Sequence, residues 1–303
     1  MHAAIPAALS PLRCVWPLAA TLGEGALWSQ REQALYFVDI LGRALHRYAP
    51  GDGGRGQARR SWSFDEEISA VAERERGPGL IVSLRRHLAL FDPATGTLQP
   101  LHMPEPERPG NRFNDAKCDA QGRLWAGSTD FACQRPTGAL YRYDPDGRCS
   151  RHLDAVHIAN GPTWSADGRT LYFNQTGHGQ TWAYPFDPDA GTLGEGRLWL
   201  QHQDADGAPD GMTTDAQGRV WIARWGGGGV SCHDADGRLL ARIELPTAHI
   251  TSCAFGGRDL RTLYVTSART GLDEAALAAQ PLAGALFAID LDAQGVAAGR
   301  FAG

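Results

Sequence analysis

The sequence predicts an all-β protein with the architecture of a six-bladed β-propeller. Three observations support this: a repeat of 41 to 50 residues, a turn motif inside the repeats, and further β-rich segments between them. A fixed period of this size is typical of a four-stranded blade, whereas an ordinary β-sandwich with recurrent turns would show none. Each repeat opens on a polar, oxygen-bearing residue, and the six openers are Glu24, Glu67, Asn114, Asn160, Asp210 and Thr251.

The repeat units follow one another along the chain. Residues 114–128, 160–176 and 210–225 show the pattern most clearly: an opener, a short strand, a turn ending in Gly-Arg, and a second strand with Trp or Tyr. An Asp side chain that bonds the backbone and a glycine at positive φ favour a hairpin at such a turn. Residues 24–39 and 251–267 are variants of this pattern, and residues 67–84 diverge most.

Segments of alternating apolar residues, such as ALHRYAP and GALYRYDPDGRC, follow the repeat units and supply the outer strands. Residues 272–280 are the one short helical candidate. We expect residues 1–13 to be a tail that leads into the first blade. Residues 14–303 should form a single domain, because all-β chains of this length commonly fold as one unit.

Composition and charge exclude several classes of protein. The net charge is −5 and basic residues do not alternate with aromatic ones, so the surface needed to bind nucleic acid is missing. No stretch approaches about 18 consecutive apolar residues, so we expect no membrane span and a cytoplasmic location. The six cysteines include no CxxC pair, which favours reduced thiols over a zinc thiolate site.

The openers of the repeats predict a cation site. In a propeller, equivalent residues at the start of each innermost strand converge on the central channel. Glu24 and Asp210 are carboxylates with small neighbours that leave room for an ion, and Asn160 adds an amide oxygen in a similar setting. Such ligands suit one divalent cation: Ca²⁺, Zn²⁺, Mn²⁺ or Fe²⁺. Glu67 stands in an acidic run, DEEIS, and we interpret it as a solvated charge.

Five motifs in order resemble a known family. They are LGEGALW, NRFNDAKCDAQGRLWAG, ANGPTWSADGRTLYF, PDGMTTDAQGRVWIA and SCAFGGRDLRTLYVTSA, within a similarity that runs from about residue 14 to residue 301. Through these motifs, the sequence resembles the senescence marker protein 30, gluconolactonase and regucalcin family. The resemblance implies a six-bladed propeller that hydrolyses sugar lactones with one divalent cation in its central channel.

The resemblance also implies roles for individual residues. Glu24, Asn160 and Asp210 match the metal ligands of the family, and Asp210 also matches its acid/base residue. In the NRFND motif, Arg112 and Asn114 match positions that hold hydroxyl and carbonyl oxygens of the substrate. The predicted metal ligands are therefore the same three residues that the spacing of the repeats indicates.

Two departures from the family bear on which sugar is bound. Some relatives carry a glutamate that touches substrate in the segment after WAG, whereas residues 128–138 here offer only Asp130 and Gln134. Asn174 follows the Tyr-Phe pair where an aspartate is common. The histidines nearest the predicted channel end, to which the sequence assigns no role, are His157, His178 and His249.

We therefore expect a gluconolactonase-like enzyme of carbohydrate metabolism, a monomer or small homo-oligomer. It would hydrolyse a glucono-, xylono- or arabinono-lactone to the aldonic acid. The cation would polarise the lactone carbonyl, and Asp210 would transfer protons between the attacking water and the leaving oxygen. Two alternatives remain open: a calcium-binding regulatory propeller, and a hydrolase of other esters or phosphotriesters. A serine hydrolase is not indicated, because the G-x-S-x-G motif is missing.

Overall fold

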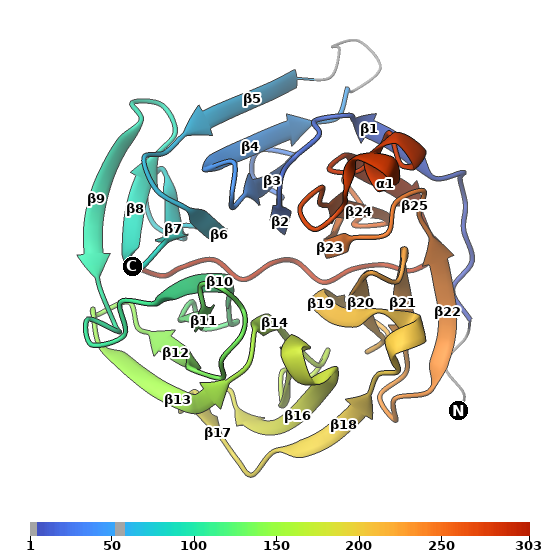
Figure 1. The fold of residues 1–303 in the computed structure, drawn as a ribbon. Coiled ribbons are helices and arrows are strands. Elements are labelled where there is room, and N and C mark those ends of the chain that lie inside the picture. The colour runs from blue at the N-terminus through green and yellow to red at the C-terminus, as the bar shows by residue number, and fades with distance from the viewer. Residues whose placement is uncertain (1–4, 52–57) are drawn as a thin grey trace.

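Six antiparallel sheets surround a central channel in the computed structural model, which describes residues 5–51 and 58–303 (Figure 1). Strands make up nearly all of the regular structure in these residues. The predicted six-bladed, all-β propeller is therefore confirmed. Residues 1–4 of the expected tail lie outside the described part of the chain. None of the described helices is long and apolar enough to cross a membrane.

Four antiparallel strands form each of the first three blades, running from the channel to the rim. The first blade contains β2 (Gly23–Ser29), β3 (Ala34–Asp39), β4 (Ala44–Ala49) and β5 (Ala58–Ser63). The second contains β6 (Ile68–Glu73), β7 (Leu80–Leu84), β8 (Leu88–Asp92) and β9 (Thr97–His102). The third contains β10 (Asn111–Cys118), β11 (Leu124–Asp130), β12 (Gly138–Tyr143) and β13 (Cys149–Val156).

The remaining blades follow the same plan with small additions. The fourth contains β14 (Ala159–Trp164), β15 (Thr170–Gln175), β16 (Gln180–Asp187), β17 (Thr192–Leu193) and β18 (Arg197–Gln201), the last two both pairing with β16. The fifth contains β19 (Ala208–Thr214), β20 (Val220–Trp225), β21 (Gly229–His233) and β22 (Leu239–Glu244). The sixth contains β23 (Ile250–Gly256), β24 (Thr262–Ser267), β25 (Leu286–Asp290) and β1 (Arg13–Trp16).

Short helical segments lie in loops between these strands. They are the 3-10 turns η1 (Thr176–His178) and η2 (Asp204–Asp206) and the helix α1 (Glu274–Ala279). The helix falls inside the predicted range 272–280. Asp273 caps it, since its Oδ1 accepts a hydrogen bond from the Ala276 N–H at 2.8 Å.

The N-terminal segment closes the ring of blades. We expected it to lead into the first blade, but β1 pairs with β25 at the outer edge of the sixth blade. Arg13 Nη1 lies 3.0 Å from Asp290 Oδ2, and the Leu9 N–H donates to the Asp290 carbonyl at 2.7 Å. The expectation was wrong because it left β25 as an open edge, whose backbone groups need partners.

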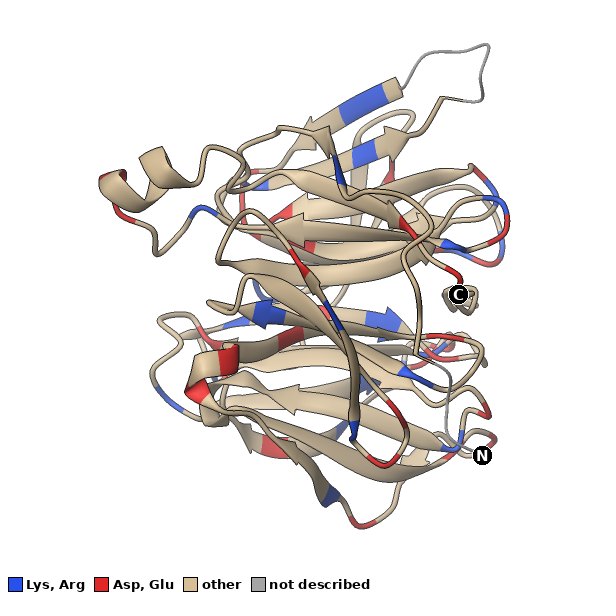
Figure 2. Ribbon diagram, turned by 90° about the vertical axis from the view of Figure 1, so that its right-hand side faces the viewer, with Lys and Arg blue, Asp and Glu red and all other residues tan. Residues whose placement is uncertain are grey.

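The channel has two different ends. The innermost strands β2, β6, β10, β14, β19 and β23 contact one another in a closed ring. Beyond β25, the chain crosses the rear end of this ring, where Phe301 N–H donates to the Glu73 carbonyl at 2.7 Å. Figure 2 shows the C-terminus on the side opposite the face that Figure 1 presents. This segment does not cross the front end, where the innermost strands begin, so a functional site can lie there.

Buried aspartates organise the turns that the sequence predicts. Asp215 Oδ1 accepts hydrogen bonds from the N–H groups of Gln217 and Arg219, each at 3.0 Å. Its Oδ2 accepts from Arg219 Nε at 2.6 Å and from Trp221 Nε1 at 2.8 Å. Gly218 lies at φ 77°, which favours glycine. Asp119 makes the same four contacts in the third blade.

The substitution Asp215→Ala should lower the free energy of unfolding by about 3 to 5 kcal/mol, because it removes the carboxylate that pairs with a buried guanidinium. Urea unfolding would measure the loss. The matched control is Asp259→Ala in the corresponding turn of the sixth blade, where the Asp259 side chain is 66% exposed. That change should cost no more than about 0.5 kcal/mol. Equal losses in the two variants would contradict this view of the turns.

Candidate functional site

The innermost strands are irregular where they begin, at the front end of the channel. The register of pairing shifts between Glu24 and Leu27, between Phe113 and Ala116, between Asn160 and Thr163, and between Pro209 and Met212. A bulge of this kind re-aims side chains and often lies beside an active site. The polar openers of four blades lie at these irregularities.

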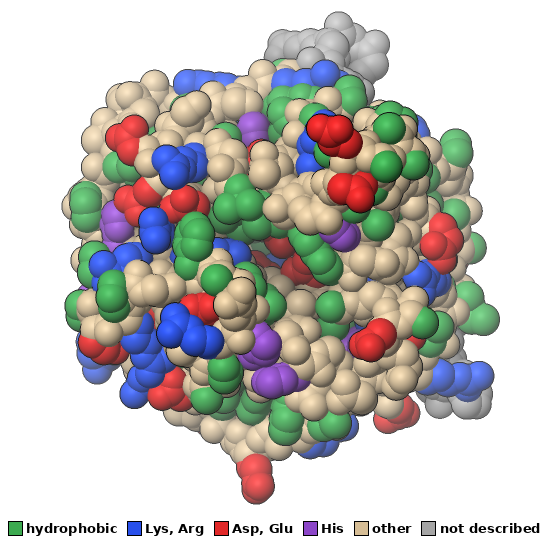
Figure 3. Space-filling view, in the orientation of Figure 1, with side chains coloured by type: hydrophobic (Ala, Val, Ile, Leu, Met, Phe, Trp, Pro, Cys, Tyr) green, Lys and Arg blue, Asp and Glu red, His purple; other side chains and the backbone are tan. Residues whose placement is uncertain are grey.

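The three predicted metal ligands are brought together at this end. Glu24, Asn160 and Asp210 are buried, at 5%, 3% and 4% exposure. The carboxyl groups of Glu24 and Asp210 lie within hydrogen-bonding reach of each other. Figure 3 shows a hollow at the centre of this face with Asp or Glu side chains on its floor. The site thus lies at the base of an opening to solvent.

The small residues beside these ligands have a different use from the one we expected. A Cβ on Gly211 would lie 2.7 Å from Ser252 Oγ in the next blade. A Cβ on Gly161 would lie 2.6 Å from Met212 Cε. These glycines therefore make room for the neighbouring strand, rather than for an ion, and allow the inner strands to approach closely around the channel.

A third buried carboxylate, Asp115, belongs to the same cluster and was missed by the sequence analysis. It is 3% exposed, and its charge raises the pKa values of Glu24 and Asp210. In a regular strand, Asn114 and Asp115 would point to opposite faces. The bulge between Phe113 and Ala116 removes this alternation. The sequence feature that could have indicated this role is the acidic residue directly after Asn114 in the NRFND motif.

Burial dominates the electrostatics of the three carboxyl groups. Burial, followed by the charge of Asp115, raises the pKa of Glu24 to about 8. Burial raises the pKa of Asp115 to about 6, although the Lys117 ammonium opposes this. The pKa of Asp210 lies well above its ordinary value, because of burial and the charges of both neighbours. Three anions together in this site would therefore be unfavourable without a compensating positive charge.

The side chains of Arg112, Asn114 and Asn160 are linked by hydrogen bonds. Arg112 Nη1 donates to Asn114 Oδ1 at 2.5 Å, and Asn114 Nδ2 donates to Asn160 Oδ1 at 2.8 Å. Asn160 Nδ2 then donates to Thr176 Oγ1 at 2.8 Å, and this hydroxyl donates to the Pro209 carbonyl at 2.6 Å. The arrangement fixes the orientation of the Asn160 amide, with its oxygen toward Asn114.

The Arg112 guanidinium is buried, and desolvation lowers its pKa. Arg112 Nη1 also donates to the Phe113 carbonyl at 3.0 Å, while Nη2 lies 4.0 Å from Cys133 Sγ. Arg112 and Asn114 were expected to face substrate. In the structure, both also bind protein groups, so each has a positioning function toward Asn160.

Two of the six openers are engaged elsewhere. Glu67 was interpreted as a solvated charge, but it is 5% exposed and lies 3.3 Å from Arg43 Nη2 and 3.9 Å from Arg85 Nε. The interpretation was wrong because these two arginines compensate its burial. Thr251 Oγ1 donates to the Gly23 carbonyl and lies 2.8 Å from Thr266 Oγ1.

Asn174, a departure from the family pattern, contacts the site directly. Its Nδ2 donates to the backbone carbonyl of Asp210 at 2.5 Å. Its Oδ1 accepts a hydrogen bond from Thr181 Oγ1 at 2.6 Å. An amide suits this position because it supplies a donor for the carbonyl, whereas an ionised aspartate would supply none. Asn174 therefore fixes the backbone that carries Asp210.

The other residues that the sequence left without a role take part in structural contacts. Asp130 Oδ1 lies 2.8 Å from Arg135 Nη2, and its Oδ2 accepts from the Gln134 N–H at 3.1 Å. His157 Nε2 lies 3.2 Å from the Cys133 carbonyl oxygen. The His157 ring lies 5.1 Å from that of His178, and the His249 ring stacks on Trp225 at 4.0 Å.

The donor set at the front end fits a hard or borderline dication. Asp210 Oδ1 and both oxygens of Asp115 have no well-formed hydrogen bond to any described residue. Buried oxygens of this kind normally have a partner, and a cation supplies one. No group of three His, Cys, Asp or Glu side chains in the described residues forms a metal site by itself. A cation bound here could also be held by the Asn160 amide oxygen, whose second lone pair is available.

Comparisons with known proteins identify the family. The family model described as the SMP-30/gluconolactonase/LRE-like region matches residues 22–269. A 6-deoxy-6-sulfogluconolactonase from Pseudomonas putida is 38% identical over 96% of this chain and 99% of its own length.

Solved structures show the same similarity. A calcium-binding regucalcin from Agrobacterium tumefaciens has a TM-score of 0.89 and is 30% identical over 94% of this chain and 95% of its own. A gluconolactonase from Xanthomonas campestris has a TM-score of 0.73 and is 25% identical over 92% and 89%. The expected enzyme class, a lactonase, agrees with the names of two of these relatives. The chain belongs to the SMP-30/gluconolactonase/LRE-like family.

Proposed function

We propose that this protein is a metal-dependent lactonase that hydrolyses a sugar lactone to the aldonic acid at the front end of its channel. The observation that carries the proposal is the convergence of buried carboxyl groups with unpartnered oxygens beside an amide oxygen and a buried guanidinium. The names of the relatives, a sulfogluconolactonase and a gluconolactonase, support the substrate class. The regucalcin described as calcium-binding supports a divalent cation.

Glu24, Asn160 and Asp210 would hold the cation, with Asp115 behind them as a further negative charge. The chemistry supplied by a bound dication is polarisation of the lactone carbonyl and stabilisation of negative charge on its oxygen. Asp210 has an unpartnered Oδ1 that would take a proton from the attacking water and return it to the ring oxygen as it leaves. The hydrogen bond from Asn174 would hold the Asp210 backbone in place while the Asp210 carboxyl group exchanges this proton.

Arg112 and Asn114 would orient the sugar. The N–H groups of Arg112 that do not bind Asn114 or Phe113 can donate to substrate oxygens in a planar fork. Asn114 Oδ1 keeps one lone pair beyond the one that Arg112 uses, so it can accept a hydrogen bond from a sugar hydroxyl. A purely calcium-binding propeller would have no need of such donors and acceptors at the opening.

Metal binding can be tested without catalysis. Adding Ca²⁺, Mn²⁺ or Zn²⁺ to protein treated with EDTA should raise its melting temperature, since a ligand at a hundred times its Kd stabilises the folded state by about 2.7 kcal/mol. Glu24→Gln should lose most of this rise. The matched control is Glu195→Gln, because residues 193–196 repeat the sequence LGEG of residues 22–25 at an exposed position. A rise unaffected by Glu24→Gln would contradict the assigned ligands.

Stability without a cation should depend on pH. The pKa of Glu24 is raised from 4.5 to about 8, so the folded state holds a proton that the unfolded state has released between these values. The free energy of unfolding should therefore fall as pH rises from about 5 to 8, by up to about 1.4 kcal/mol per pH unit. Glu24→Gln should make this slope shallower in urea unfolding at several pH values. A cation-free protein equally stable at pH 5 and pH 8 would refute the prediction.

Asp210→Asn should lower kcat for lactone hydrolysis by at least about a hundredfold, because the amide cannot accept and return the proton. A pH-drop assay on glucono-, xylono- and arabinono-lactone and on a phosphotriester would measure this. The control is Asp204→Asn in η2, where the carboxylate is exposed. If the phosphotriester were hydrolysed and no lactone were, the substrate class would be wrong. A folded Asp210→Asn variant with normal activity would rule out the acid/base role.

A further inference from the structure

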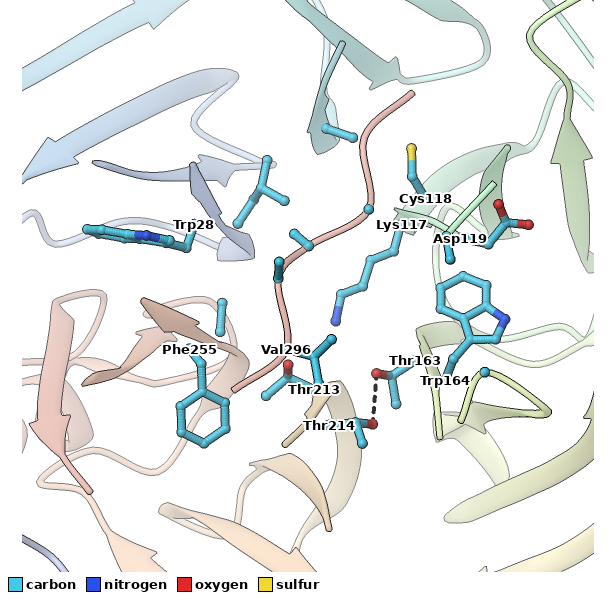
Figure 4. Close-up of a pocket in the computed structure, with 18 of the residues that line it drawn as sticks. Trp28, Lys117, Cys118, Asp119, Thr163, Trp164, Thr213, Thr214, Phe255 and Val296 are labelled. Carbon is cyan, nitrogen blue, oxygen red and sulfur yellow. Dashed lines mark hydrogen bonds between the residues drawn. The ribbon is translucent and has the colours of Figure 1, made fainter. Parts of the chain in front are cut away.

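A second cavity lies at the rear end of the channel, on the side crossed by the C-terminal segment (Figure 4). Its volume is about 220 Å³. The walls come from the ends of the innermost strands, such as Leu27, Val71 and Phe255, and from residues 296–299 of the crossing segment. The residues assigned to the cation and the sugar do not line it, so the two spaces are distinct.

The only lysine in the sequence, Lys117, reaches into this cavity. Figure 4 shows its side chain extending from β10 toward the channel axis, with the Nζ atom near Thr213, Thr163 and Val296. Lys117 Nζ donates to the Met212 carbonyl. An ammonium group has three N–H donors, so two are left for other acceptors. Apart from the histidines, all other basic residues of the chain are arginines, so Lys117 carries its only side-chain ammonium group.

Two hydroxyl groups stand on the same side of the cavity. Thr163 Oγ1 and Thr214 Oγ1 lie 3.1 Å apart and share one hydrogen bond. Only one of the two hydroxyl protons is used in that bond, so the other is available to an acceptor. An ammonium group next to a hydroxyl donor is suited to a carboxylate, because charge-assisted hydrogen bonds are the stronger kind.

The rest of the wall is mainly apolar, with Leu27, Val71, Phe255 and Val296 among its side chains. A polyhydroxylated sugar would lose its hydrogen bonds to water against such a surface. The volume is below the roughly 300 to 1,000 Å³ that holds a drug-sized ligand, so a nucleotide is too large. The space thus suits a small molecule with one anionic end and an apolar body.

The segment that crosses the cavity has few backbone hydrogen bonds along its middle. Gly295 N–H donates to the Leu260 carbonyl at 2.8 Å, and Phe301 N–H donates to the Glu73 carbonyl at 2.7 Å. Between these anchors, residues 296–300 make no backbone hydrogen bond to another described residue. Val296 is 49% exposed although it also lines the cavity. The backbone of this segment is therefore bonded at its ends, and the Arg300 side chain adds an ion pair, with its Nε 2.5 Å from Glu75 Oε2.

We infer that the rear cavity is a second ligand site, which takes a small monocarboxylate with an apolar or aromatic body. The carboxylate binds Lys117 Nζ and the hydroxyl pair of Thr163 and Thr214, and the body packs against Phe255 and Val296. This site goes beyond the proposed lactone hydrolysis and does not depend on it.

The single lysine makes a direct test possible. Reductive methylation with ¹³C-formaldehyde labels only Lys117 Nζ and the N-terminal amine, and the Lys117→Met variant assigns the two resonances. Titration of the labelled full-length protein with benzoate should shift the Lys117 resonance saturably. Benzamide, which has the same shape without the charge, should bind at least about tenfold more weakly, as expected for loss of a charge-assisted hydrogen bond.

Three variants locate the response. Benzoate binding followed by calorimetry should weaken at least about tenfold in Lys117→Met and recover in Lys117→Arg, which restores the charge. It should be unchanged in Glu24→Gln, because a carboxylate bound to the front cation would respond to that variant instead. The inference is wrong if Lys117 resists labelling in the folded protein, if benzoate and benzamide give the same shift, or if Glu24→Gln alone abolishes binding. None of these readouts uses lactone hydrolysis.

Discussion

The burial of three carboxyl groups in one small space is the constraint on which the rest of the structure depends. Glu24, Asp115 and Asp210 come from three different blades, and burial raises the pKa of each. The charge of Asp115 raises the pKa values of Glu24 and Asp210 further. Such a cluster would spread apart unless the backbone held it. The closed ring of innermost strands holds it, and the pairing of β1 with β25 completes the last blade behind that ring.

Bulges in the innermost strands determine which polar side chains face the channel. Regular strands would direct alternate side chains away from the channel, whereas the bulges at the start of the inner strands bring neighbouring polar residues inward. Hydrogen bonds from Arg112 through Asn114 and Asn160 to Thr176 then connect the third and fourth blades. Asn174 adds a bond to the backbone of the fifth. The Asn160 side chain and the Asp210 backbone are therefore oriented by residues of neighbouring elements, as a preorganised site requires.

The period of the repeats was enough to predict the propeller, and the equivalence of their first residues was enough to place Glu24, Asn160 and Asp210 together. Other features were not accessible from the same pattern. The sequence LGEG occurs twice, and only its position in the blade separates buried Glu24 from exposed Glu195. Asp115 was missed because the alternation of apolar and polar residues in a sequence does not reveal where a strand has a bulge. Closure by β1 and the rear position of Lys117 depend on contacts between the ends of the chain and distant blades.

The two ends of the channel thus differ in charge and lining, with carboxylates and amides in front and a single ammonium among apolar side chains behind. We propose that the front cluster binds a dication. Diffraction from crystals grown with Mn²⁺, recorded for its anomalous signal, tests this most directly. The account predicts one peak within bonding distance of side-chain oxygens of Glu24, Asn160 and Asp210. A map with Mn²⁺ bound elsewhere, and with no metal between the Glu24 and Asp210 carboxyl groups, would contradict this proposal.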